Sequence, residues 1–287
     1  MKFVKMHGLG NDYVYIDCFR NPAPEDPSAL SVAMSRPHFG VGADGLVLIQ
    51  PSEAADCRMR MFNKDGSEGD MCGNAIRCVG KYMHDTGLIS GDRLTVETRA
   101  GIKALALTVQ DGVCTHARVD MGAPSFDPAR IPVDAPDHHV TIDLPDGERL
   151  RFTCVNVGNP HAVTFDLYPE DERFYRYGPY LERHPLFPNR ANIEFARVNG
   201  AGDVDMRVWE RGSGETMACG TGATATLVAA AADGLCGRKA DVHLPGGTLT
   251  IEWDAATNHV FMTGPATVSF TGEWTDALAG WPVPKDE

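Results

Sequence analysis

Two cysteines in this sequence stand in nearly the same local setting. Cys219 lies in GETMACGTGATATLVAAAADG (residues 214–234), and Cys72 lies in GDMCGNAIRCVGKYMHDTG (residues 69–87). Each cysteine comes just before a glycine and the start of a predicted helix. The N-terminus of a helix has backbone N–H groups without intrahelical partners, and it favours negative charge. We therefore expect the pKa of both thiols to be lowered toward neutrality, so that each is able to gain and lose a proton.

Two such thiols, facing each other across one cleft, suit the inversion of a carbon acid. One thiolate would remove the α-proton from one face of the substrate carbon, and the opposite thiol would donate a proton to the other face. The reverse reaction exchanges these roles, as the racemisation or epimerisation of an amino acid requires. The backbone amides of Gly73, Asn74, Gly220 and Thr221 are expected to bind the carboxylate and stabilise the negative charge that develops on it.

The two cysteines belong to a longer internal repeat. When moved by 147 residues, MRMFNKDGSEGDMCG (59–73) aligns with MRVWERGSGETMACG (206–220), and five of the fifteen positions are identical. Ordinary residue usage gives about one identity over this length. The alignment continues downstream, where Gly87 falls on Gly234, and upstream, where Asn11 falls near Asn159. A duplicated unit, with two like halves related by a pseudo-twofold axis, is the simplest explanation.

The elements around the cysteines are mainly short strands parted by Gly, Asp, Asn and Pro. One main helix interrupts the strands in each half, and Gly87 and Gly234 are expected to end these helices. In the second helix Ala, Val and Leu occur on every face, which predicts burial on all sides. We predict an α+β fold of two pseudo-symmetric domains, each a curled, mostly antiparallel β-sheet or barrel wrapped around a central helix.

The length of the chain and the repeat place the domain boundaries. With 287 residues, the chain is long enough for two domains that each bury a core. The first is expected to span residues 1–122, with a C-terminal strand at 268–287 returning to it, and the second to span 123–267. The proline-rich stretch 121–139 is interpreted as their connection.

Composition and charge indicate a protein that binds a small-molecule substrate. The formal net charge of −13, with no basic run to offset it, argues against binding to nucleic acid or to an anionic membrane. The N-terminal residues do not form a signal-peptide core, and no apolar run is long enough to span a bilayer, so a cytoplasmic location is expected. The eight cysteines include no C-x-x-C pair, so we interpret them as free thiols and expect no metal.

Five motifs, in order and across nearly the whole chain, resemble those of diaminopimelate epimerase. They are MHGLGNDY (6–13), NKDGSEGDMCGNAIRC (63–78), VGNPHAV (157–163), NRANIEF (189–195) and WERGSGETMACGTGA (209–223). The resemblance implies a cofactor-independent isomerase that converts LL-diaminopimelate to the meso form, in the synthesis of lysine and peptidoglycan precursors. It also implies two pseudo-symmetric domains and a homodimer.

The same resemblance implies roles for individual residues. Cys72 and Cys219 match the acid/base pair, and His161 and Glu210 match positions that assist catalysis. Arg211 is suited to binding a carboxylate through two parallel hydrogen bonds, and Glu210 to receiving an ammonium group. The positions that match substrate-binding residues are Asn11, Asn63, Asn159, Asn192, Glu210 and Arg211, with the backbone of Gly73, Asn74, Gly220 and Thr221.

Two other functions remain compatible with these residues. A proline or hydroxyproline racemase of the same fold would use the same two thiols on a smaller substrate, although Glu210 and Arg211 favour a substrate with a second charged end. A redox sensor would instead join Cys72 and Cys219 in a regulatory disulfide. The glycine clusters do not have the spacing of a nucleotide-binding loop, and no lysine has the setting of a pyridoxal Schiff base, so no cofactor is expected.

Some of these residues also have a purely structural interpretation. His161 is compatible with a hydrogen-bonding role in the core, and Asn11 and Asn159 with turns. Two positions depart from the family pattern. Gly45 stands where some members carry a glutamine that contacts substrate, and Ala75 replaces a glycine after the first Cys-Gly-Asn. Both differences are expected to affect the affinity for substrate more than the proton transfer.

Overall fold

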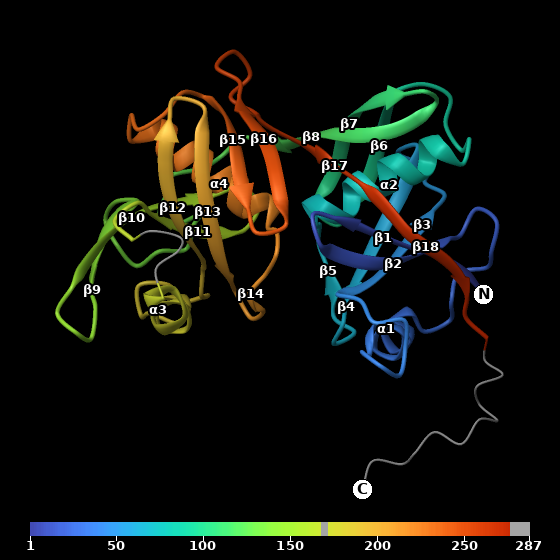
Figure 1. Cartoon of the computed structure of the whole chain (residues 1–287), viewed down its shortest axis with the longest axis horizontal. Coiled ribbons are helices and arrows are strands. Elements are labelled where there is room, and N and C mark those ends of the chain that lie inside the picture. The colour runs from blue at the N-terminus through green and yellow to red at the C-terminus, as the bar shows by residue number, and fades with distance from the viewer. Residues whose placement is uncertain (168–171, 276–287) are drawn as a thin grey trace, which may run out of the picture.

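The computed structural model describes residues 1–167 and 172–275, which form two lobes that lie side by side (Figure 1). The first lobe holds β1 (Lys2–Gly8), β2 (Asn11–Asp17), α1 (Pro27–Ser35), β3 (Gly45–Gln50), β4 (Cys57–Asn63), β5 (Glu68–Gly69), α2 (Gly73–Asp85), β6 (Arg93–Thr98), β7 (Gly101–Gln110) and β8 (Val113–Gly122). The second lobe holds β9 (His139–Asp143), β10 (Arg149–Asn156), β11 (Pro160–Thr164), α3 (Arg173–Glu182), β12 (Asn192–Gly200), β13 (Asp203–Glu210), β14 (Gly214–Glu215), α4 (Gly220–Ala232), β15 (Lys239–Leu244) and β16 (Gly247–Trp253). Strands β17 (Val260–Pro265) and β18 (Thr267–Glu273) then cross back to the first lobe.

Both lobes have the same strand pairing, which accounts for the internal repeat. In the first lobe β2 pairs with β3 and β4 pairs with β6 in parallel, and in the second lobe β11 with β12 and β13 with β15 do the same. The remaining pairs are antiparallel. Helices α2 and α4 each have 13 residues, and their first residues are separated by the 147 positions of the repeat. The predicted α+β fold, with two curled and mostly antiparallel halves, is confirmed.

The two central helices are buried because their apolar residues face strands on several sides. Residues 222–230 of α4 are all buried, as the even distribution of Ala, Val and Leu predicts. Helix α2 buries Ile76, Val79 and Met83. Gly87 and Gly234 both have φ of +72°, the left-handed conformation in which glycine commonly follows the end of a helix.

Two stretches of chain connect the lobes. Residues 123–138 join β8 to β9, where the proline-rich composition predicts a connection. Strand β17 pairs with β8 and leads into β18, which pairs antiparallel with β1 from Lys2↔Glu273 to His7↔Thr267. This pairing supports the proposed return of 268–287 to the first domain, of which residues 276–287 lie outside the described residues.

Two short helices, α1 and α3, are not anticipated by the sequence analysis. They occupy corresponding places on the outside of the two lobes (Figure 1). Helix α1 begins after Asp26, whose side chain accepts a hydrogen bond from the N–H of Ala29 at 2.9 Å. Helix α3 contains Pro179, and its sequence does not predict a helix because proline is disfavoured in helix interiors. None of the helices in the described residues reaches the length and hydrophobicity of a bilayer-spanning segment.

Candidate functional site

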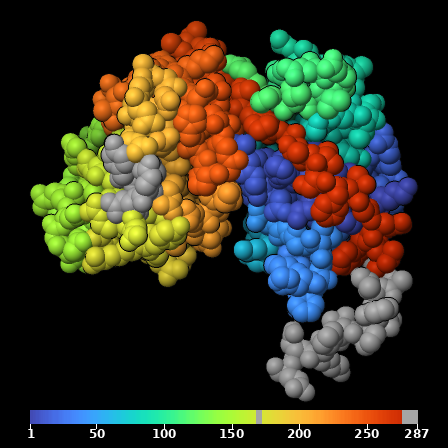
Figure 2. All heavy atoms as spheres, viewed as in Figure 1, coloured from blue at the N-terminus to red at the C-terminus, as the bar shows by residue number. Residues whose placement is uncertain are grey.

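A cleft of about 430 Å³ is lined by residues of both lobes. In the space-filling view the surface is hollowed between the lobes (Figure 2). His161 and Asn192 do not line the cleft. The predicted site residues that do line it are Asn11, Asn63, Cys72, Gly73, Asn74, Asn159, Glu210, Arg211, Cys219, Gly220 and Thr221.

The N-termini of α2 and α4 meet at this cleft. A Cβ atom added to Gly220 would lie 3.5 Å from the Cα atom of Gly73 and 2.8 Å from Sδ of Met262. A Cβ atom added to Gly73 would lie 2.9 Å from Cε of the same methionine. A side chain at either position would require the end of Met262 on β17 to move. Each cysteine directly precedes one of these glycines, so the contact brings both thiols to one cleft.

Cys72 is the N-cap residue of α2. Its Sγ accepts a hydrogen bond from the N–H of Ala75 at 3.5 Å, and its thiol donates to Oδ1 of Asn11 at 3.5 Å. Asn11 is oriented by its neighbours, because its Nδ2 donates to Asp44 at 2.7 Å and its Oδ1 also accepts from Asn74 at 3.2 Å. The side chain that faces the first thiol is therefore held by two further hydrogen bonds.

Cys219 caps α4 in the same way. Its Sγ accepts a hydrogen bond from the N–H of Gly222 at 3.3 Å and lies 3.4 Å from the hydroxyl of Thr221. The carbonyl of Ala218, just before it, accepts a hydrogen bond from Nδ2 of Asn74 at 2.9 Å. Because Asn74 lies in the first turn of α2, this hydrogen bond ties the two helix ends together across the lobes.

The pKa values of the two thiols differ from what the helix ends alone predict. Burial raises the pKa of Cys72 above its ordinary value, although two backbone N–H groups of α2 act to lower it. Burial raises the pKa of Cys219 well above the ordinary value, and the carboxylates of Glu210 and Glu194 raise it further. The expected lowering is wrong because removing water from a thiolate costs more than a helix end restores.

His161 is fully buried behind the cleft. It lies on β11, which runs parallel to β12 and places His161 opposite Asn192. Its Nδ1 is 2.6 Å from Oε1 of Glu194, and its Nε2 is 2.7 Å from Oδ1 of Asn159. Burial raises the pKa of Glu194, and the neighbouring imidazole acts in the opposite direction. His161 thus connects a residue of the cleft with a buried carboxylate.

Asn192 holds the backbone that carries other residues of the site. Its Nδ2 donates to the carbonyl of Pro160 at 2.9 Å, and its Oδ1 accepts from the N–H of Arg211 at 2.9 Å. The side chain of Arg211 is exposed at the cleft, with Nη1 donating to the carbonyl of Asn189 at 3.2 Å. Asn192 therefore holds the backbone of Arg211 in place relative to β11.

Glu210 and Asn63 occupy corresponding places at the ends of β13 and β4. Glu210 accepts a hydrogen bond from the hydroxyl of Thr216. Burial raises the pKa of Glu210, whereas Thr216 and His161 lower it. Asn63 donates from Nδ2 to the hydroxyl of Ser67 at 2.9 Å. The two lobes therefore present a carboxylate on one wall of the cleft and an amide on the other.

Several side chains around the thiols were missed by the sequence analysis. Tyr13 and Lys103 line the cleft. Burial raises the pKa of Tyr13 well above its ordinary value, and the adjacent Cys72 contributes to this. An offset of 148 residues, which aligns Asn11 with Asn159, also aligns Tyr13 with His161 and could have identified Tyr13. Glu194 is the one acidic residue among the apolar residues 193–196 of β12, and this pattern could have identified it. No such pattern marks Lys103.

Gly45 cannot carry a substrate-contacting side chain in this protein. A Cβ atom at this position would lie 2.0 Å from the carbonyl oxygen of Phe62 and 2.8 Å from the ring of Tyr13. Gly45 does not line the cleft, whereas the Tyr13 ring does. The space that a larger residue would need is thus occupied first by the backbone of Phe62 and then by Tyr13.

The other six cysteines do not line the cleft. Four of them are buried and two are half-buried, and none of the eight cysteines forms a disulfide. Burial raises the pKa of Cys57 and of Cys154 to about 12. These thiols are consistent with the structural role that the sequence predicts for them.

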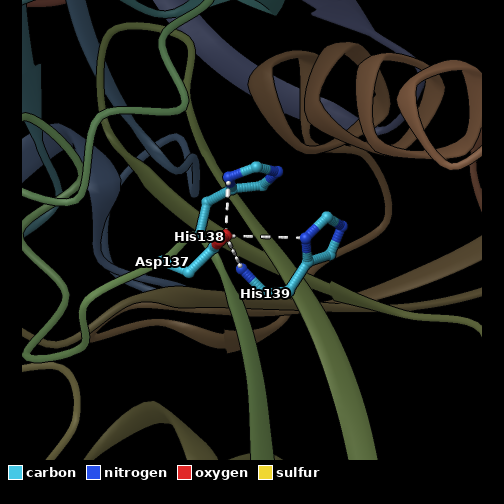
Figure 3. A group of neighbouring side chains, drawn as sticks. All are labelled: Asp137, His138 and His139. Atoms are coloured by element: carbon cyan, nitrogen blue, oxygen red, sulfur yellow. Dashed lines mark hydrogen bonds and ion pairs between the residues drawn. The ribbon is translucent and has the colours of Figure 1, made fainter.

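Asp137, His138 and His139 form a cluster outside the cleft (Figure 3). One ligand atom from each lies within 4.8 Å of the others. Asp137 Oδ1 is 3.0 Å from Nδ1 of His138 and accepts a hydrogen bond from the backbone N–H of His139 at 3.0 Å. The Nε2 atom of His139 faces Asp233 at 2.9 Å. The polar groups of this cluster are thus paired with one another and with Asp233, and none of the three residues lines the cleft.

Comparison with known proteins identifies the family. The family model described as diaminopimelate epimerase matches residues 3–126 and 153–269. The chain belongs to this family. Diaminopimelate epimerase from Acetivibrio thermocellus is 54% identical over 280 residues, which cover 95% of this chain and 98% of that protein. The one from Desulfovibrio desulfuricans is 51% identical over an alignment of 288 positions, which covers 96% of this chain and 98% of that protein. The protein is accordingly an isomerase of the epimerase type.

Solved structures show the same fold at low sequence identity. A probable proline racemase from Agrobacterium radiobacter, with bound carbonate, superposes with a TM-score of 0.72 at 18% identity, covering 97% of this chain and 95% of that chain. A hydroxyproline epimerase from Agrobacterium vitis, with bound trans-4-hydroxy-L-proline, gives 0.70 at 18% identity, covering 95% and 91%. These likenesses concern the fold alone.

Proposed function

We propose that this protein interconverts LL- and meso-diaminopimelate without a cofactor, with Cys72 and Cys219 as the acid and base. The observation that carries this proposal is the meeting of two helix N-termini, each capped by a thiol, at one cleft. Family membership supports the choice of substrate, because the relatives at about half identity over nearly the whole chain bear the name of this enzyme.

The substrate carboxylate next to the reacting carbon binds between the helix ends. Backbone N–H groups at Gly73, Asn74, Gly220 and Thr221 donate hydrogen bonds to it. When one thiolate removes the α-proton, the electron pair of the broken C–H bond moves into an enediolate that these donors stabilise. The opposite thiol then gives its proton to the other face of the carbon. The first sulfur ends as a thiol and the second as a thiolate, so protons and charge balance.

The raised pKa values of the thiols suit a pair that ionises when substrate enters. The substrate brings an α-ammonium group, and a nearby positive charge favours the ionised form of an acid. Electrostatic interactions are also stronger where side chains are buried away from water, as at Cys219. A thiolate therefore forms next to the carbon that it must deprotonate.

The rest of the cleft selects a substrate with a second charged end. Arg211 is exposed in the cleft and binds the distal carboxylate, while Glu210 receives an ammonium group. Asn63 and Asn159 add directional donors and acceptors on opposite walls. His161 acts through Asn159, because its ring nitrogens connect that amide to Glu194.

The decisive experiment follows epimerisation and proton exchange together. The purified protein, kept reduced, is incubated in D₂O with LL-diaminopimelate and, separately, with L-proline. We expect meso product that carries deuterium at the inverted carbon, because the second thiol takes its proton from solvent, and no racemisation of proline. Turnover of proline alone would show a racemase. Absence of exchange with either substrate would favour the redox-sensor interpretation, which no observation on this structure supports.

We also propose a homodimer, as the family resemblance implies. Size-exclusion chromatography with light scattering should give about twice the chain mass of 31.1 kDa. A cytoplasmic location likewise stays a prediction, and cell fractionation tests it.

A further inference from the structure

Arg77 is the largest fully buried side chain in the described residues, and the proposed mechanism does not use it. It lies on α2, five residues after Cys72 and one turn after Gly73. Its Nη1 donates to the carbonyl of Gly73 at 3.1 Å and its Nε donates to the carbonyl of Pro265 at 3.2 Å. Its Nη2 has no hydrogen-bond partner among the described residues. The guanidinium thus lies at the seam where α2 meets the strand that crosses between the lobes.

Two glycines make room for this guanidinium. A Cβ atom on Gly8 of β1 would lie 2.7 Å from Nη2, and a Cβ atom on Gly264 of β17 would lie 3.1 Å from Nε. Larger residues at these positions would press on the guanidinium from both sides. The fold therefore keeps a space for a buried cation at this point.

No carboxylate in the described residues pairs with Arg77. A buried, unpaired charge is costly, and an anion close by is what offsets that cost. Burial lowers the pKa of Arg77, and the acidic groups that act in the opposite direction are Cys78, Cys72 and Tyr15. Burial raises the pKa of Cys78 to about 11 and that of Tyr15 well above its ordinary value. Cys72, which lines the cleft, is the remaining partner that substrate chemistry ionises.

The corresponding position in the second lobe carries Thr224, 147 residues later. Its hydroxyl donates to the carbonyl of Gly220 at 2.8 Å, just as Arg77 donates to the carbonyl of Gly73. The second lobe thus has the same hydrogen bond to the helix carbonyl, but it has no positive charge at this position. The two thiols therefore cap helices of the same geometry with a cation behind only one of them.

We propose that Arg77 is a positioning residue that makes Cys72 the first thiol of the pair to ionise and leaves Cys219 as the protonated partner. The inference concerns the charge of the two thiols, and its meaning for catalysis rests on the proposed function. It makes the pair unequal before substrate binds, although the backbone around the two sulfurs is alike.

The groups that face each thiol agree with this assignment. Around Cys72 they are Asn11 and Tyr13 from β2, the N–H groups of Asn74 and Ala75, Arg77 and, from the second lobe, Glu210. Around Cys219 they are the carboxylates of Glu210 and Glu194, the hydroxyl of Thr221 and the N–H of Gly222. One cation and one carboxylate thus act on the first thiol, whereas two carboxylates act on the second.

Site-resolved alkylation of the free, reduced protein tests the assignment. The protein is treated briefly with iodoacetamide across a range of pH, and mass spectrometry of the peptides gives a rate for each cysteine. The midpoint of each pH profile is compared, because Cys72 is the more accessible sulfur and its absolute rate is higher for that reason alone. We expect the Cys72 midpoint to lie at the lower pH. A lower midpoint for Cys219 would overturn the proposal.

Three variants separate charge from structure. Arg77→Met removes the charge, and Arg77→Thr reproduces the residue of the second lobe. Both should slow alkylation of Cys72 at pH 8 by about tenfold or more, because removing an adjacent opposite charge changes a proton affinity by about one unit or more. Arg77→Lys should retain the wild-type midpoint. Arg149→Met, at an exposed residue outside the cleft, is the matched control and should change neither profile.

A Cys72 profile that is the same in wild type and in folded Arg77→Met would contradict the proposal. Near-UV circular dichroism identifies the folded variants. If the uncharged variants do not fold, the order of the Cys72 and Cys219 midpoints in the wild type still tests the proposal. Epimerase activity is measured on the same wild-type sample. An active protein with reversed midpoints refutes the role of Arg77 alone, and an inactive protein with the expected midpoints refutes the proposed function alone.

Discussion

The two halves of this protein share one backbone plan and surround their thiols with different charges. Arg77 behind the first thiol corresponds to Thr224 behind the second, and Asn63 corresponds to Glu210. Val47 and Glu194 are a third such pair, both fully buried on corresponding strands. One cation and one carboxylate thus act on the first thiol, whereas two carboxylates act on the second.

This difference shows how a duplicated scaffold divides its tasks. Proton transfer to either face of one carbon needs two like helix ends, and the glycine contact between α2 and α4 keeps them alike. Recognition of a ligand with a distinct distal end needs unlike walls, and the ends of β4 and β13 have diverged accordingly. Geometry is repeated where the chemistry is symmetric, and charge differs where the ligand is asymmetric.

The largest expected effect comes from removing either of the two thiols that begin the equivalent helices. Cys72→Ala and Cys219→Ala should each lower epimerase turnover by about 10³-fold or more, because each removes one of the two proton-transfer groups. Turnover is measured by conversion of LL-diaminopimelate. Cys236→Ala, which removes a half-buried thiol outside the cleft, is the control. Substantial turnover in either of the first two variants would show that one thiol is enough.

A smaller effect is expected when the unlike walls are made more alike. Glu210→Gln leaves the second wall neutral, as Asn63 leaves the first, and should lower kcat/KM by about a hundredfold because an ammonium partner is lost. Since burial raises the pKa of Glu210, the ionised carboxylate is disfavoured there, and the free energy of unfolding should be unchanged or increased.

The control for this variant is Glu252→Gln, which lies outside the cleft lining. Denaturant unfolding and steady-state kinetics are measured on both. An unchanged kcat/KM for Glu210→Gln would mean that the carboxylate has no part in the reaction, and a large loss of stability would mean that its role is structural.

The smallest effects are expected at the corresponding positions 75 and 222. A Cβ atom on Gly222 would lie 3.0 Å from Oε1 of Glu194 and 3.3 Å from the sulfur of Cys219, so Gly222→Ala should shift that thiol and lower kcat by about tenfold. Ala75→Gly should leave kcat nearly unchanged and lower the free energy of unfolding by about 0.5–1 kcal/mol, because glycine costs more entropy in a helix. Equal losses of kcat in both variants would show that the crowding around the second thiol is unimportant.

The sequence predicted those features that depend on neighbouring residues. The strand pattern indicated short strands interrupted by one main helix in each half, and the glycines after α2 and α4 marked where both helices end. The motifs placed Cys72 and Cys219 at the starts of those helices. Helices α1 and α3 were missed because they are short and, in α3, interrupted by Pro179. The direction of the pKa shift of the two thiols was predicted wrongly because the helix ends are visible in the sequence and the burial is not.

The repeat and the local motifs by themselves determined that two thiols begin two equivalent helices, because capping positions and glycine stops are read from residues close together in the chain. Only the tertiary structure decided that these helix ends meet, that Glu194 lies beside His161 and that Arg77 lies unpaired behind one thiol. These properties depend on which distant strands pack together and on how much water that packing excludes, and burial is what sets the cost of a charge.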